Sequence, residues 1–556
     1  MTGLPLAERR ARKRRTAPEV RDLPLDPPEL APDVRVHPPT SEDQPWFLQR
    51  GTNHYYRLTA DLARLVALLD GTRPVRAMPQ RLGAPWTEED IRRALAFLSD
   101  AELLRTASDA HRRRASGRLR LVPPLTVQLT LFDPSRMLAA AARVTRFAAT
   151  GASVWTALAI IGAGLLALVI SAGDLRAALG EPVPYLTAVA VVIGTLAATG
   201  LHELGHGLVL ASYGGRPQRI GVMLFYLTPA FFCDVSDGWR LPSHRQRAHV
   251  ALAGILVQGA IGGTLALAAL LPLPRDVRLT LLLLAVVTLI ACLVNTIPFV
   301  KLDGYIALMS WLDVTHLRDK AMADARSTLS HALFGTERER RLPQYGWAVP
   351  FGFACMLFPL FLVGNALLLW SDTLSRLGLV GSLATVAIVT VALSGLVREI
   401  VRLFREARAQ RAGALRRWTV GFVGIALVAG AAFVPVPHTM AGGFIVTDRG
   451  TEMMLPTSVD SQRLAPGTPV ELKRGGLVLD ERVGTAVVSE TPAREASAPL
   501  SALFPVRETE PLIPVRAIGL REVDLVGAAP GIAVVDLGTQ PLWLWLTSRA
   551  ADAFTP

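Results

Sequence analysis

Long apolar segments separated by short polar loops constrain the fold of this chain more than any other feature. Apolar stretches long enough to be membrane spans, about 18 residues or more, recur between roughly residues 150 and 435. A helix of ~20 residues crosses the ~30 Å hydrocarbon core of a bilayer, whereas strands buried in a soluble α/β protein need only about 4–8 residues. The sequence therefore predicts a mainly α membrane protein, and its 51% hydrophobic content with only 19% charged residues agrees.

The positions of these segments predict about seven transmembrane helices. They lie near residues 152–171, 184–206, 249–271, 279–300, 347–370, 379–397 and 418–435. Arginine and lysine concentrate in the loops near 213–247, 301–345 and 398–417, and such an excess is typical of cytoplasmic loops. The alternation predicts a multi-pass protein with a cytoplasmic N terminus and an extracytoplasmic C-terminal domain.

Membrane topology also explains the net charge of +12, because the basic residues lie beside the apolar segments. Membrane topology requires that placement, so we do not expect a nucleic-acid partner. The three cysteines, Cys233, Cys292 and Cys355, lie in apolar surroundings without CxxC spacing. They are expected to be packing residues, neither a disulfide framework nor a metal site.

Changes in composition divide the chain into six segments with different expected structures. The first is a basic, Pro-rich cytoplasmic tail, expected to be disordered, and the last is an extracytoplasmic β-rich domain. Between them lie a small folded domain, a linker containing a strand, a membrane core and additional transmembrane helices. In chain order these segments are 1–45, 46–105, 106–145, 146–310, 311–435 and 436–556. Within the core, Ile220–Phe232 is apolar but too short to span, which predicts a re-entrant hairpin.

Residues 46–105 have the pattern of a winged helix. Two short strands are expected near Trp46–Leu48 and His54–Leu58, followed by three helices. Thr59 and Thr87 precede the first and third helices as N-cap residues. Acidic residues follow Thr87 directly, where the helix dipole favours them.

This segment resembles the peptide-chaperone domain of PQQ biosynthesis, which recognises leader peptides of ribosomally made, modified peptides. The stretches YYRLTADLARLVALLDGTRPV and TEEDIRRALAFLSDAELL carry the resemblance. It implies that the edge strand and the third helix bind a precursor peptide as an added strand. A winged helix without a peptide ligand is the alternative, because a fold does not fix a function.

The motif His202-Glu203-Leu204-Gly205-His206 lies at the end of the second predicted span. Residues four apart share one face of a helix, so His202 and His206 can both ligate one zinc ion. Glu203 lies beside that position and can take a proton from the attacking water. A satisfied polar cluster in a helix bundle is the alternative, although polar groups in an apolar helix are costly without a function.

A catalytic zinc needs a third protein ligand and one open position. Asp303, in the segment NTIPFVKLDG, lies at the inner end of the fourth predicted span. The second and fourth spans are expected to run in the same direction, which brings Asp303 to the depth of both histidines. The alternative is a carboxylate at a helix end that pairs with Lys301.

Together the two motifs resemble the site-2 protease family of intramembrane metalloproteases. The second motif of that family, N-x-x-P-x-x-x-L-D-G, matches from Asn295 to Gly304, about a hundred residues after HExxH. The resemblance implies ligation of one Zn²⁺ ion by His202, His206 and Asp303, with Glu203 as the general base. It also implies that a helix with G-P-x-x-N binds substrate together with Asn295. Here Gly254 and Gln258 occupy the end positions of that pattern, and Ile255 replaces the proline.

The segment LFYLTPAFFCDVSDGWRLPSHRQR is similar to a subgroup of these proteases that carries the same front domain. Its members accompany bacterial modified-peptide pathways, including that of the daptides. We therefore expect a bacterial cell-membrane endopeptidase that cleaves such a precursor, alongside other biosynthesis or export proteins. Two alternatives are regulated intramembrane proteolysis of a signalling protein and a non-catalytic export or immunity protein with a structural metal.

Overall fold

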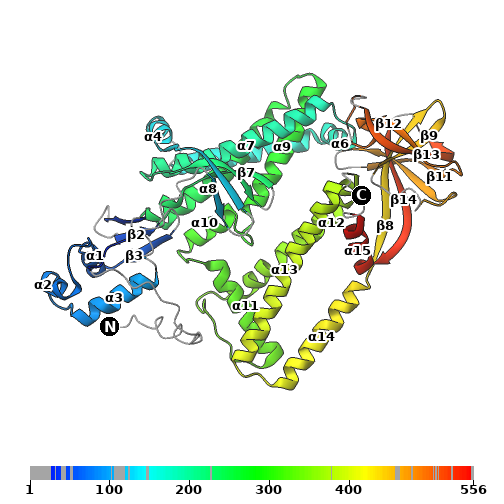
Figure 1. The fold of residues 1–556 in the computed structure, drawn as a ribbon. Helices are drawn as coiled ribbons and strands as arrows, with labels where there is room; N and C mark the ends of the chain where they lie inside the picture. The colour runs from blue at the N-terminus through cyan, green and yellow to red at the C-terminus, as the bar shows by residue number, and fades with distance from the viewer. Residues whose placement is uncertain are drawn as a thin grey trace. The chain divides into compact units, whose positions relative to one another are not determined.

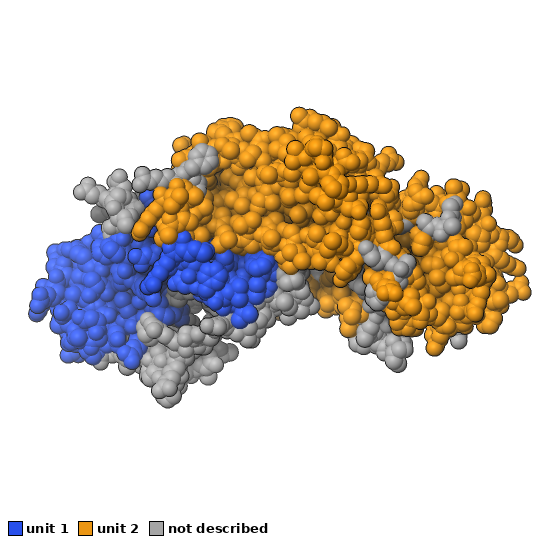
Figure 2. Space-filling model, turned by 90° about the horizontal axis from the view of Figure 1, so that it is seen from above, with its two compact units in different colours: residues 1–137, 214–243 blue, residues 138–213, 244–556 orange. Residues whose placement is uncertain are grey.

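A computed structural model gives the fold of the chain (Figure 1). The structure describes residues 27–31, 33–38, 46–50, 54–101, 103–105, 119–122, 126–145, 150–225, 228–376, 379–457, 464–476, 480–504, 506–507, 510, 512–526 and 530–552. Most of the predicted tail and the first part of the predicted linker lie outside these residues. Two compact units are present, one formed by residues 1–137 and 214–243 and one by residues 138–213 and 244–556 (Figure 2).

The first unit begins with the predicted winged helix. Three strands pair antiparallel in the order β1-β2-β3. Their bounds are β1 Val34–His37, β2 Trp46–Arg50 and β3 His54–Leu58. Three helices follow, α1 Ala60–Val66, α2 Met78–Leu82 and α3 Glu88–Asp100, with a 3-10 turn over Val75–Ala77. The first strand is a correction, because Val34–His37 belongs to the segment predicted to be a disordered tail. Its backbone pairs with β2.

Sequence-local interactions fix the ends of these helices. Thr59 caps α1 by accepting a hydrogen bond from the backbone of Leu62, as predicted. Thr87 and Asp90 form a reciprocal capping box at the start of α3. Hydrogen bonds from the Thr87 hydroxyl and backbone hold the pKa of the exposed Asp90 carboxyl below its usual value. The buried face of α3 joins a core whose fully buried members include Leu48, Leu65, Met78, Ile91 and Leu98.

A second sheet in this unit has the antiparallel order β4-β5-β6-β7. Its strands are β4 Leu119–Val122, β5 Thr126–Phe132, β6 Ile220–Phe225 and β7 Thr228–Cys233. The stretch predicted to be a re-entrant hairpin is thus a β-hairpin, and β6 pairs with β5 almost a hundred residues earlier. Gly221 makes that pairing possible, because a Cβ there would lie 2.1 Å from the Leu129 carbonyl oxygen.

Seven helices among the described residues are long and apolar enough to cross a membrane, which confirms the predicted number. They are α5 Gly151–Ile170, α7 Tyr185–Ser212, α8 His244–Ala268, α9 Arg275–Thr296, α12 Ala348–Arg376, α13 Leu379–Ala409 and α14 Ala414–Ala432. Shorter helices lie between them or beside them, namely α4 Ser135–Val144, α6 Ala172–Gly180, α10 Asp303–Trp311 and α11 Leu317–Phe334.

The C-terminal part of the second unit is a closed β-barrel. Six strands follow the order β11-β10-β14-β8-β9-β13, and β11 also pairs with β13 and closes the ring. The barrel strands are β8 Pro435–Thr447, β9 Gly450–Pro456, β10 Pro469–Gly475, β11 Asp480–Val488, β13 Leu512–Leu525 and β14 Gly531–Pro541. Strand β12, Arg494–Pro499, flanks β13, and helix α15, Leu542–Asp552, follows β14. Helices hold 56% of the residues that the structure describes, so a mainly α description is only partly correct for a chain with this barrel.

Helix α8 is the most buried of the apolar helices. In its most apolar 18-residue stretch, 56% of the residues are buried inside the protein. It packs against α5, α7, α9 and α10. Small residues allow these close approaches, as is usual where apolar helices meet. A Cβ at Gly164 of α5 would lie only 2.2 Å from the Cα of Gly263 in α8.

The close packing of α5 against α8 predicts that alanine substitutions at two neighbouring glycines affect stability differently. Gly164→Ala forces the two backbones apart and should destabilise the protein by about 1–3 kcal/mol, measured by unfolding in detergent. Gly162→Ala is the matched control, because nothing lies within 4 Å of a Cβ at that position. That change should be neutral or slightly stabilising, since alanine favours helix. Equal effects of the two substitutions would contradict the packing described here.

Candidate metal centre

Two histidines on α7 face the same point inside the helix bundle. His202 and His206 are both about 4% exposed, and their rings meet edge to face with centroids 4.8 Å apart. Their Nε2 atoms are 3.2 Å from each other. This arrangement follows from the helical period, because residues four apart project from one face.

The turn between α9 and α10 brings a carboxylate to these histidines. Helix α9 ends at Thr296, and α10 begins with Asp303. The Asp303 Oδ2 atom lies 2.8 Å from His202 Nε2 and 3.4 Å from His206 Nε2. Gly304 allows the turn to close, since a Cβ there would lie 2.2 Å from the Thr296 carbonyl oxygen.

The spacing of the three ligand atoms fits a metal ion. A tetrahedral zinc with ligands at ~2.1 Å separates neighbouring ligand atoms by ~3.4 Å, close to the three distances measured here. Among the residues that the structure describes, His202, His206 and Asp303 form the one group of three with this geometry. The predicted ligands are therefore brought together, and the group can hold a metal ion.

A hydrogen bond determines which ring nitrogen of His206 carries the proton. Its Nδ1 atom is 2.7 Å from the Val250 carbonyl oxygen, which can only accept a hydrogen bond, so Nδ1 carries the proton. In the neutral ring, Nε2 then presents a lone pair toward His202 and Asp303. A cation at the meeting point of these atoms removes their mutual repulsion, and a carbonyl behind a histidine is the usual support for a metal ligand.

The electrostatic environment keeps the carboxylate ionised. Burial opposes the charge on Asp303, yet when the two imidazoles are also protonated on Nε2, hydrogen bonds from His202 and His206 hold the pKa of the Asp303 carboxyl well below its ordinary value. As the first residue of α10, Asp303 also benefits from the positive end of the helix dipole. An ionised carboxylate with two imidazole nitrogens is a donor set suited to zinc.

Glu203 lies at the side of this group, adjacent to the first ligand in sequence. Its carboxylate Oε1 is 4.0 Å from His202 Nε2, and its side chain is 18% exposed, against 5% for His202. Glu203 is therefore close to the three candidate ligands and more accessible to solvent than His202. A carboxylate so placed can act as a general base.

Helix α8 packs against the two histidines at Gly254, a residue that has no side chain. A Cβ at Gly254 would lie 2.3 Å from His206 Nε2 and 2.7 Å from His202 Nε2. One turn further along α8, Gln258 is buried and its Oε1 accepts a hydrogen bond of 3.2 Å from Asn295 Nδ2. The three residues predicted to contact substrate therefore lie beside the centre, and their role in binding stays a prediction.

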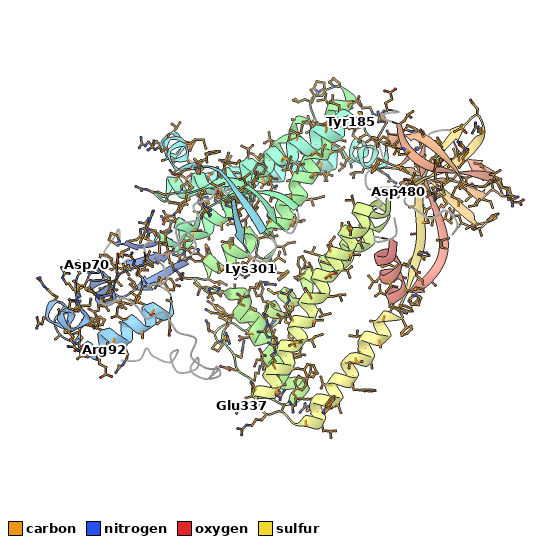
Figure 3. The ribbon with its side chains drawn as sticks, viewed as in Figure 1. Asp70, Arg92, Tyr185, Lys301, Glu337 and Asp480 are labelled. Carbon is orange, nitrogen blue, oxygen red and sulfur yellow. The ribbon has the colours of Figure 1, made fainter. Side chains whose placement is uncertain are left out.

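Nearby charged and aromatic residues have other partners. Lys301, labelled in Figure 3, lies 3.8 Å from Asp319, so the alternative of a Lys301–Asp303 pair is not what the structure has. His249 bonds to the Tyr213 hydroxyl at 2.8 Å, and His244 packs edge to face on Trp311. Neither histidine belongs to the group formed by His202, His206 and Asp303.

Sequence reasoning missed one supporting group, the Val250 carbonyl behind His206. A backbone acceptor has no residue-type signature. The only available signal was its position one helical turn before Gly254.

Comparisons with family models, curated proteins and solved structures find no match to this chain. The resemblance to site-2 proteases therefore rests on the two motifs alone, and the geometry of the centre is independent support for metal binding.

The contact of Gly254 with both imidazoles predicts a specific defect in metal binding. Gly254→Ala places a methyl group where the Nε2 atoms lie, so the purified protein should fold but retain little metal by elemental analysis. Gly200→Ala on α7 is the control, because a Cβ there has nothing within 4 Å. Full metal content in Gly254→Ala would show that the ligands do not meet as described.

Proposed function

We propose that this chain is a membrane-embedded zinc endopeptidase of the site-2 protease type. The observation that carries the proposal is the convergence of His202, His206 and Asp303, with Glu203 beside them, among helices apolar enough to span a bilayer. Two imidazoles and one carboxylate are the ligand set of many zinc peptidases. A structural zinc is usually held by four protein ligands, and among the described residues three meet.

The proposed role of each group in peptide hydrolysis follows from the position of its side chain. His202, His206 and Asp303 would hold the zinc ion, which would supply a Lewis acid to lower the pKa of water and to polarise the carbonyl of a peptide bond. Glu203 accepts the proton of the attacking water and can pass it to the leaving amine. Asn295 and Gln258 lie beside the centre, where their amide groups can orient the substrate backbone.

A bacterial cell membrane is the proposed location, with the N terminus in the cytoplasm. The seven apolar helices and the basic loops between alternate pairs support this placement. The same topology has an extracytoplasmic C-terminal domain.

The proposed substrate is the precursor of a ribosomally made, modified peptide. Strand β3 supports this idea, because among the described strands it pairs with β2 on one side and is the last strand of the sheet on the other. Such an edge can accept a peptide as a further strand. Other biosynthesis or export proteins of the same pathway are the proposed partners.

Substitution of Glu203 tests the chemistry separately from the metal. Glu203→Gln should retain one zinc per chain and lower the cleavage rate about 10²–10⁴-fold, whereas Asp303→Ala should lose zinc as well. Comparing newly formed N termini in membranes of the native host, with wild-type or Glu203→Gln protein, measures cleavage without a known substrate. Identical sets of N termini would point instead to a non-catalytic protein, and a metal other than zinc would refute the cofactor assignment.

Substrate capture tests the front domain. A photoreactive side chain at Arg57 in β3, carried by the full-length Glu203→Gln protein, should cross-link to a short ribosomal peptide in the native host. The same group at Arg64, on the exposed side of α1, is the control and should capture little. Cross-linking mainly to a membrane signalling protein would favour regulated intramembrane proteolysis.

A further inference from the structure

The loop that delivers Asp303 is held from outside the region that resembles site-2 proteases. Residues 297–302 connect α9 to α10, and helices α11 and α12 pack around this loop and α10. The aromatic ring of Phe299 lies 5.8 Å from the ring of Phe351 and 5.4 Å from that of Phe358, both on α12. The additional helices therefore contact the segment that positions the third metal ligand.

A proline inside α12 leaves one backbone carbonyl of that helix without its usual hydrogen-bond donor. Pro359 lies within the helix and has no N–H, so it cannot donate the helical hydrogen bond to the carbonyl four residues earlier. That carbonyl belongs to Cys355. In a membrane span, where water is scarce, such a carbonyl needs another donor.

Arg318, near the start of α11, supplies that donor and reaches the metal-ligand loop with the same guanidinium. Its Nη2 donates to the Cys355 carbonyl at 3.3 Å, and its Nε donates to the Phe299 carbonyl at 3.2 Å. The backbone N–H of Arg318 also donates to the hydroxyl of Tyr305 at 3.3 Å. Tyr305 is buried two residues after Asp303, so Arg318 holds the chain on both sides of the ligand.

We propose that Arg318 is a positioning residue for the metal centre, linking the proline-interrupted helix α12 to the loop that presents Asp303. The rigid fork of a guanidinium suits this task, because it addresses two carbonyl groups at a fixed separation. The inference deepens the proposed function and rests on it for its consequence, metal retention. The restraint on the loop itself requires no metal.

A second arginine on the same helix provides a matched control. Arg326 is also half-buried on α11, but its guanidinium pairs with Glu399 at 2.9 Å and Glu406 at 3.3 Å on α13. Both of these partners lie on α13, not on the loop or on α10. Replacing either arginine removes one cation and a set of interhelical contacts from α11.

The experiment compares Arg318→Ala, Arg318→Lys and Arg326→Ala in the full-length protein in detergent. Zinc affinity is measured by chelator competition, and hydrogen exchange is measured for the backbone of residues 297–305. Arg318→Ala should weaken zinc binding about 10–100-fold and speed exchange in this segment, and Arg318→Lys should restore only part of both. Arg326→Ala should leave both near wild type.

The two readouts separate the possible failures. Unchanged exchange and affinity in Arg318→Ala would overturn the positioning role, as would equal effects in Arg326→Ala. If the wild type binds no zinc, the proposed function fails, and the exchange measurement alone then decides whether Arg318 restrains the loop.

Pro359→Ala tests whether Arg318 bonds to the Cys355 carbonyl because Pro359 has no N–H to donate. It restores an N–H for the Cys355 carbonyl and should compete with Arg318, so zinc binding should weaken in the wild-type background. The same change should add little in the Arg318→Ala background, because coupled residues give non-additive effects. Additive losses would show that the carbonyl of Cys355 is not the anchor.

Discussion

The close packing of α7 against α8 is the interaction on which the candidate centre depends. Gly205, inside the HExxH motif, would place a Cβ 2.9 Å from the Val257 side chain and 3.3 Å from the Ala253 carbonyl oxygen. Gly254, on the opposing helix, leaves the space that the two imidazoles fill. Without these two glycines the helices would separate, and the Val250 carbonyl would no longer reach His206. Small residues here serve both helix association and the enclosure of polar groups.

The need to satisfy polar groups in apolar surroundings explains much of the remaining architecture. Asp303 is stabilised by two imidazoles, His206 by a carbonyl, and the Cys355 carbonyl by Arg318. Each of these contacts crosses from one helix to another. Polar pairing thus determines which helices must stay adjacent, while apolar packing determines how closely they approach.

The membrane region is tied to the barrel by similar contacts within the second unit. Arg507, beside the barrel, donates to the Pro182 carbonyl at 2.7 Å and lies 3.5 Å from Glu181. A short parallel bridge joins Val183 to Val506. This attachment lies in the segment that leads into α7, the helix of the two histidines.

Sequence reasoning succeeded where the signal is local. The number of apolar helices follows from segment length, and the N-caps at Thr59 and Thr87 follow from residue type. His202 and His206 share a face because of the helical period alone. Asp303 required a topological argument from charge, and the structure does place it with the histidines.

Pairings between distant segments were decided only by the tertiary structure. The strand at Val34–His37, the β5–β6 pairing and the closure of the barrel depend on backbone hydrogen bonds that carry no residue signature. The same holds for Arg318, whose partners are main-chain carbonyls. The sequence by itself determined the long apolar helices and the candidate metal ligands, because periodicity and length are properties of one segment. Which backbone atoms support those residues depends on the approach of separate segments, and only the folded chain defines that.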